Sequence, residues 1–141
     1  MFNFIKKNKN LDSDKTNLFS KTASLLIHAA RMDESYTEKE KTIIKKTLID
    51  LSVNKEEIDK IMNEAEENEK NSNQILDFTK DLKKTDQDFK IKLVESLWKI
   101  IYSDAKSDMF EDNLMRRLTG LLYFDKKMVG DIKEKIKKNL L

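Results

Sequence analysis

Four carboxylates stand at matching positions of an internal repeat. One constant shift along the chain aligns LIHAARMDESYTEKEKTIIKK with LWKIIYSDAKSDMFEDNLMRR, which places Asp33 on Asp104 and Glu40 on Glu111. In each copy an apolar segment ends in the Asp, and the Glu follows seven residues later. We therefore predict a helix-loop-helix pseudo-repeat, with the Asp at the end of one helix and the Glu in the first turn of the next.

These acids point to a metal site if the two repeats pack about a pseudo-twofold axis. Both loops would then reach one end of the bundle and bring Asp33, Glu40, Asp104 and Glu111 together. Such a set favours a hard divalent cation with oxygen ligands, Ca²⁺ or Mg²⁺. Neither loop has the alternating acids or the central Gly of an EF-hand. The nearby acids that could complete the ligand shell are Glu34, Glu38 and Asp108.

Helix capping explains the two glutamates equally well. Glu40 lies three residues after Thr37, and Glu111 lies three residues after Asp108, so each pair can form a capping box. The two aspartates are different, because a carboxylate at the C-terminal end of a helix meets partial negative charge. A bound cation would offset that repulsion, and so would a neighbouring basic residue such as Arg31 or Lys106.

Composition excludes several classes of function. The chain has no Cys and a single His, His28, which rules out a zinc finger, a Cys-His hydrolase and a disulfide framework. No nucleophile motif, phosphate loop or aromatic sugar platform accompanies the carboxylates, so we expect no enzymatic activity. The net charge is only +2, and the C-terminal lysines lack interleaved aromatic residues, so we expect no nucleic-acid binding. No transmembrane or signal segment is visible, which indicates a cytoplasmic protein.

Apolar spacing and the scarcity of turn residues predict an all-α fold. The 141 residues include no Pro and only two Gly, and apolar positions recur every three or four residues. Helix-start signals occur at Thr37 with Glu40, Asn54 with Glu57, Thr85 with Asp88, and Asp108 with Glu111. We predict a single compact bundle of about seven helices over 16–32, 37–51, 55–70, 74–83, 86–103, 109–123 and 126–139.

The fifth of these helices should be central, because its apolar residues cover much of its circumference. We expect Leu97 and Ile101 to be inaccessible to solvent and Trp98 to belong to the core. Gly120 in the sixth helix would permit close approach of a neighbouring helix. Residues 1–14 lack periodicity and are expected to form a loose N-terminal arm, and residues 15–141 are expected to form the helical domain.

The repeated loops resemble the TerB family of tellurite-resistance proteins, whose domain also occurs at the N-terminus of DjlA co-chaperones. The family's element is Ala-Asp-Gly with a Glu seven residues after the Asp, in two copies, and here MDESYTEKE and SDAKSDMFE carry the acids. The likeness covers about residues 15–140, although Glu34 and Ala105 replace the glycines. It implies a compact all-α fold, metal binding by acidic residues, and a non-enzymatic role in stress-response or membrane-associated complexes.

Two functional hypotheses follow. The first is a domain that binds Ca²⁺ or Mg²⁺ through the two loops and uses the ion for structure or sensing. The second is a metal-free helical adaptor that docks a protein partner through an apolar groove or its charged surface. Both are compatible with a peripheral association with membranes.

Overall fold

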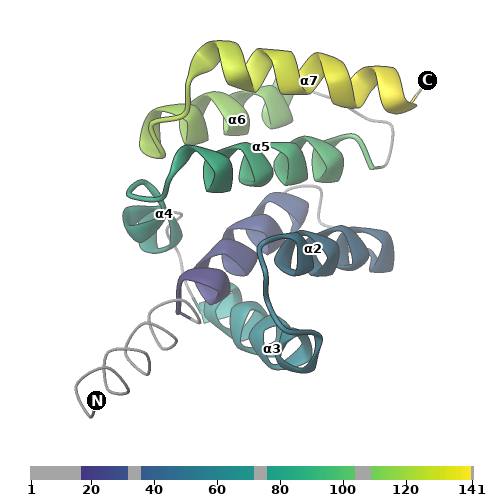
Figure 1. Cartoon of the computed structure of the whole chain (residues 1–141), viewed down its shortest axis with the longest axis vertical. Helices are drawn as coiled ribbons and strands as arrows, with labels where there is room; N and C mark the ends of the chain where they lie inside the picture. The colour runs from purple at the N-terminus through teal and green to yellow at the C-terminus, as the bar shows by residue number, and fades with distance from the viewer. Residues whose placement is uncertain (1–16, 32–35, 72–75, 104–108, 141) are drawn as a thin grey trace.

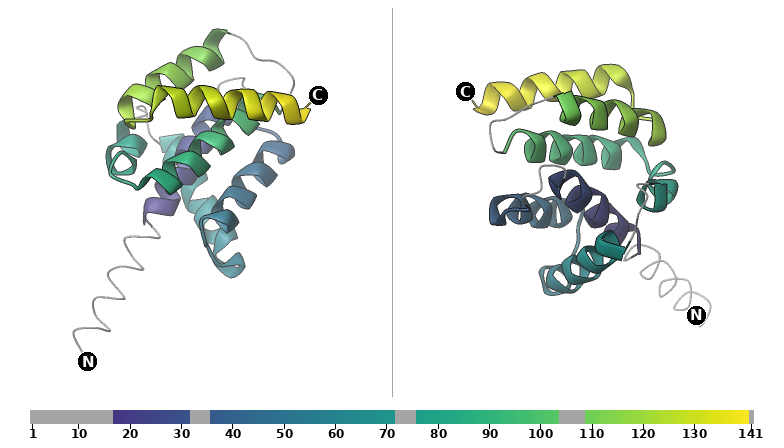
Figure 2. Two further views of the ribbon diagram at one scale, coloured as in Figure 1. Left: turned by 45° about the horizontal axis from the view of Figure 1, so that its top comes forward. Right: turned by 180° about the vertical axis from the view of Figure 1, so that it is seen from behind.

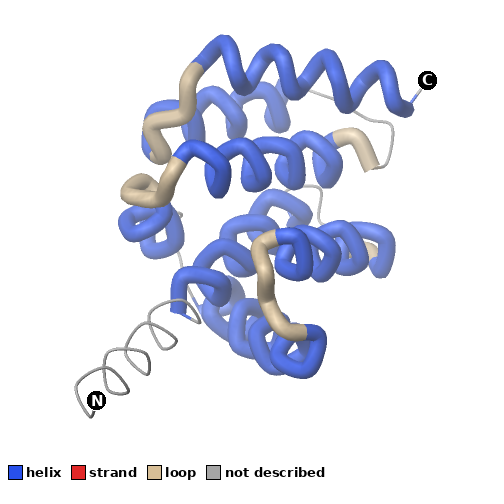
Figure 3. The backbone as a smooth tube through the Cα atoms, viewed as in Figure 1, coloured by secondary structure: helices blue, strands red, loops and turns tan. Residues whose placement is uncertain are grey.

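The computed structural model describes residues 17–31, 36–71, 76–103 and 109–140. Every regular element in these segments is an α-helix (Figure 3), which confirms the all-α prediction. The first helix covers residues 17–30, and the predicted helices differ from the observed ones only at their ends. The others are α2 (Glu38–Asp50), α3 (Lys55–Asn71), α4 (Leu76–Leu82), α5 (Gln87–Ile101), α6 (Met109–Leu121) and α7 (Lys126–Leu140).

Side-chain caps fix where α2 and α5 begin. Thr37 and Glu40 form the predicted capping box, in which the Thr37 hydroxyl accepts from the Glu40 amide at 3.2 Å. The prediction for α5 is wrong by one residue, because the cap is Asp86, whose carboxylate accepts from the Phe89 amide at 2.9 Å. The physical reason is that the Thr85 hydroxyl is already engaged with the preceding helix, where it donates to the Leu82 carbonyl at 2.6 Å.

The helices form two groups joined by α4. The helix over 17–30, α2 and α3 make the first group, and α5, α6 and α7 make the second (Figures 1 and 2). Helix α2 packs against both α3 and α5, α5 packs against α7, and α4 packs against α6. The packing of α2 against α5 is therefore one contact between the two groups. A buried bond supports this contact, since the hydroxyl oxygens of Thr47 and Ser96 are 2.7 Å apart.

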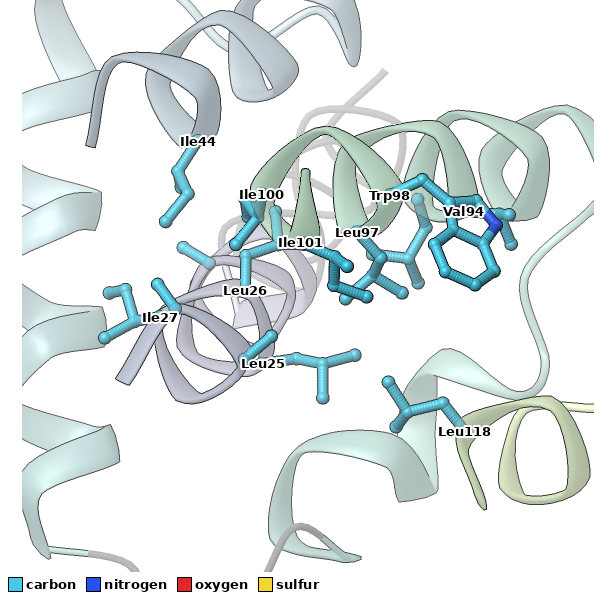
Figure 4. Packing of buried hydrophobic residues seen from close by; sticks show 14 of the residues in the cluster. Leu25, Leu26, Ile27, Ile44, Val94, Leu97, Trp98, Ile100, Ile101 and Leu118 are labelled. Carbon is cyan, nitrogen blue, oxygen red and sulfur yellow. The ribbon is translucent and has the colours of Figure 1, made fainter. Parts of the chain in front are cut away.

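Helix α5 supplies the centre of the core. Leu97 is fully buried and Ile101 and Trp98 are each 3% exposed, which confirms the prediction for this helix. Its side chains meet those of Leu25 and Leu26 from the helix over 17–30 in one apolar cluster (Figure 4). The Trp98 indole also donates to the Val129 carbonyl at 3.1 Å, which ties α5 to α7 without leaving the buried N–H unpaired.

The backbone repeats locally with the period found in the sequence. The shift that carries Asp33 onto Asp104 also carries both ends of α2 onto those of α6, and the start of α3 onto that of α7. The turns that follow α2 and α6 correspond in the same way, because Ser52 (φ 78°) and Tyr123 (φ 56°) occupy equivalent positions and both have left-handed conformations. The superposition of the complete repeats stays a prediction.

The N-terminal arm predicted over 1–14 lies outside the described residues.

Candidate functional site

Of the four predicted ligands, Glu40 is the one whose side chain the structure describes. It lies in the first turn of α2 and is 6% exposed. Asp33 and Asp104 belong to the segments 32–35 and 104–108, outside the described residues, and Glu34 and Asp108 lie there too. Glu111 lies near the start of α6, where the structure describes its backbone and not its side chain.

The Glu40 carboxylate is oriented by the helix cap. Its Oε1 atom accepts from the Thr37 amide at 2.9 Å and from the Thr37 hydroxyl at 2.9 Å. The capping explanation for this residue is thus confirmed. The same bonds hold the Glu40 carboxylate in a fixed orientation in the first turn of α2.

The residues that border the two loops lie side by side. Lys39, in the first turn of α2, donates from Nζ to the carbonyl oxygen of Ser103 at 2.8 Å. Lys39 follows the first loop, and Ser103 directly precedes Asp104 and the second loop. Lys39 and Ser103, which border these loops in the sequence, are therefore at the same end of the bundle. A hollow of about 260 Å³ lies at this junction, lined in part by Lys39, Lys99 and Ser103.

Arg31 borders the first loop but has a partner on another helix. Its Nη1 atom lies 2.9 Å from Glu69 Oε2, and His28 Nδ1 lies 3.5 Å from Glu69 Oε1. Glu69 is only 9% exposed, and its two carboxylate oxygens face His28 on the helix over 17–30 and Arg31 directly after that helix. Sequence reasoning missed Glu69 among the many acids of α3. A usable signal was its spacing, because it continues the buried stripe of Ile58, Met62 and Ala65.

Tyr36 links the end of the first loop to α3. Its hydroxyl donates to Glu66 Oε1 at 3.1 Å, and Arg31 and Lys41 place their cationic groups 5.4 and 5.0 Å from the ring centroid. Burial raises the pKa of the Tyr36 phenol above its ordinary value, and the neighbouring Glu66 carboxylate raises it further. The phenol is therefore a neutral hydrogen-bond donor at physiological pH.

No group of three or more His, Asp or Glu in the described segments is arranged to hold a metal ion.

A comparison with protein families assigns the chain to a family. The family model described as tellurite resistance protein TerB matches residues 19–134. This chain belongs to the TerB family. The TerB match extends from the helix over 17–30 into α7 and so spans both acidic loops. No curated protein and no solved structure matches the chain. Within the described part of this TerB-family chain, no helix is both long and apolar enough to span a membrane.

Proposed function

We propose that this TerB-family domain binds Ca²⁺ or Mg²⁺ through Asp33, Glu40, Asp104 and Glu111, and that it acts without catalysing a reaction. The observation that supports the proposal is the bond from Lys39 to the Ser103 carbonyl, because it brings the borders of the two loops together. An ion shared between the loops would join the two helical groups at this end. We further propose that the ion serves structure or sensing in a cytoplasmic stress response of the tellurite-resistance type.

The donor chemistry fits a hard cation. All four residues offer carboxylate oxygens, which Ca²⁺ and Mg²⁺ prefer, and the sequence has no thiol to attract a softer metal. The single imidazole, His28, faces Glu69, so the chain offers no cluster of histidines to a softer metal. Within the proposed site, the hydrogen bonds from Thr37 would orient Glu40, and the aspartates would contribute oxygens from both loops.

Charge repulsion gives the proposal a specific test. Four carboxylates that converge without a cation repel one another, so removal of one charge should spare or stabilise the metal-free domain while weakening ion binding. We expect Asp104→Asn to melt at the same or a higher temperature than wild type in chelator, and at a lower temperature in saturating Ca²⁺ or Mg²⁺. Saturation at about 100 times the Kd stabilises the folded wild type by about 2.7 kcal/mol.

Asp86→Asn is the matched control, because the same chemical change removes a carboxylate whose role as a helix cap is established. Its effect on the melting temperature should be the same with chelator and with either ion. Equal shifts of Asp104→Asn in both conditions would rule out the ion site, as would a wild-type melting temperature that ignores millimolar Ca²⁺ and Mg²⁺.

A further inference from the structure

A groove runs beside α6 on the second group of helices. Its larger part, of about 840 Å³, opens between α5, α6 and α7, and a second hollow of about 330 Å³ lies between α4 and α6. Gly120 and Tyr123 line both parts, so the two form one continuous surface, which we call the α6 groove. The apolar side chains that line the larger part are Trp98, Met115, Phe124 and Val129.

The charges that line the α6 groove all have one sign. Arg116, Lys126 and Lys133 line the larger part, and Lys80 and Lys83 line the smaller one. No Asp or Glu is among the residues that line either part. The whole chain, by contrast, has 28 basic and 26 acidic residues, so this surface is a local concentration of positive charge.

Exposed apolar side chains border the same surface. Large hydrophobic residues that are exposed in the described segments are Ile49, Leu76 and Tyr123, and the last two line the α6 groove. Tyr123 is 68% exposed, and its backbone is left-handed at φ 56°, a conformation that Gly or Asn adopts more readily. The Lys83 ammonium lies 6.0 Å from its ring centroid. The Tyr123 ring is therefore mostly accessible to a ligand beside this turn.

The two glycines of the chain line the same groove, and neither the backbone nor the packing requires glycine at these positions. Gly120 lies in α6 and Gly130 in α7, and both line the larger part of the groove. Neither has a positive φ, and a Cβ atom on either would meet nothing within 4 Å. The expected role of Gly120 in close helix packing is therefore wrong. Glycine lowers helix stability relative to alanine, yet here it leaves open space where a ligand backbone can approach.

We propose that the α6 groove docks a short acidic segment of another protein, with apolar side chains that enter the hollow. The positive lining selects acidic residues, the concave apolar floor accepts Leu or aromatic anchors, and the glycines admit the backbone. A bilayer surface or a nucleic acid would satisfy the charge, but a peptide also offers single apolar side chains that can enter a hollow between helices. This docking surface is separate from the proposed metal site, because it includes the C-terminal end of α6, whereas the second acidic loop precedes the N-terminal end.

Peptide selection tests the proposal directly. A displayed library of random peptides of about twelve residues is selected on the full chain, and binding of the selected peptides is measured by fluorescence anisotropy. We expect enrichment of Asp and Glu together with Leu or aromatic residues, and affinities that fall as salt concentration rises. Gly130→Leu, which places a side chain in the open groove, and Arg116→Glu should each weaken binding by about tenfold or more.

Arg117→Glu is the matched control, because it reverses a charge at the next position of α6 without altering a residue that lines the groove. It should leave the affinity of the selected peptides within about twofold of wild type. Circular dichroism establishes whether each variant is folded. If Gly130→Leu does not fold, Arg116→Glu still tests the groove. The measurements are repeated with chelator and with Ca²⁺, so that failure of the metal site does not affect the result.

Several outcomes would overturn the proposal. One is a library that yields no acidic, apolar peptides, and another is binding that neither groove variant weakens. Binding to phosphatidylglycerol vesicles or single-stranded DNA in place of the peptides, lost in the same variants, would assign the groove to a membrane or to nucleic acid. Concentration-dependent self-association in sedimentation, abolished by Gly130→Leu and by Arg116→Glu, would assign it to a second copy of the chain.

Discussion

Replacing the two glycines with alanine should make the protein more stable. Glycine in a helix interior is less favourable than alanine by about 0.8–1.0 kcal/mol, and the benefit is realised when the native backbone accepts a Cβ atom. Both positions meet that condition, since neither φ is positive and the space around each new Cβ is open. Gly130 is well inside α7, whereas Gly120 is next to the last residue of α6, where helix ends fray.

The expected size follows from these positions. Gly130→Ala should raise the free energy of unfolding by about 1 kcal/mol, and Gly120→Ala should raise it by about half as much. With an unfolding entropy of about 2.1 cal/mol/K per residue, 1 kcal/mol corresponds to about 3 °C in the melting temperature of a chain of 141 residues. The double variant should therefore melt about 4–5 °C above wild type, since the two contributions should be nearly additive.

Urea denaturation followed by circular dichroism measures the change in free energy, and thermal melting gives the change in temperature. An unchanged slope of the free energy of unfolding against urea concentration would indicate that the variants change stability and not the surface exposed on unfolding. Destabilisation by either substitution would refute the reasoning, because it would mean that a neighbouring atom or a strained backbone requires glycine at that position.

Three other predictions concern the core, the Tyr36 phenol and a helix cap. Leu97→Ala should lower the free energy of unfolding by about 2–5 kcal/mol, because Leu97 is fully buried, and a loss below about 0.5 kcal/mol in urea titration would contradict its position in the core. The pKa of Tyr36 is raised above its ordinary value of 10.0, so its contribution to stability is present below that pH and is lost as the pH rises further. The free energy of unfolding should consequently decline less steeply above pH 10.0 in Tyr36→Phe than in wild type. Denaturation at a series of pH values measures this decline, and equal slopes against pH in the two proteins would exclude the effect. Thr37→Ala should cost about 1 kcal/mol by removing the hydroxyl bonded to the Glu40 amide, which thermal melting would detect; an unchanged melting temperature would count against the cap.

The sequence was most informative about features that depend on neighbours along the chain. Apolar spacing identified the helices, since a helical period requires only that one face be buried. The capping box of Thr37 and Glu40 was predictable for the same reason, because its atoms are three residues apart. The density of apolar residues in α5 likewise identified the core helix, as the burial of Leu97 shows.

Tertiary structure decided which side chains meet across helices. Sequence spacing placed a base, Arg31, beside the first acidic loop, but only the packing of the helix over 17–30 near α3 gives that base Glu69 as its partner. The bond between Lys39 and the Ser103 carbonyl joins residues 64 positions apart, so no local pattern could reveal it. The larger part of the α6 groove likewise exists because α5, α6 and α7 leave a hollow between them, and the open space beside Gly120 and Gly130 is a property of that packing.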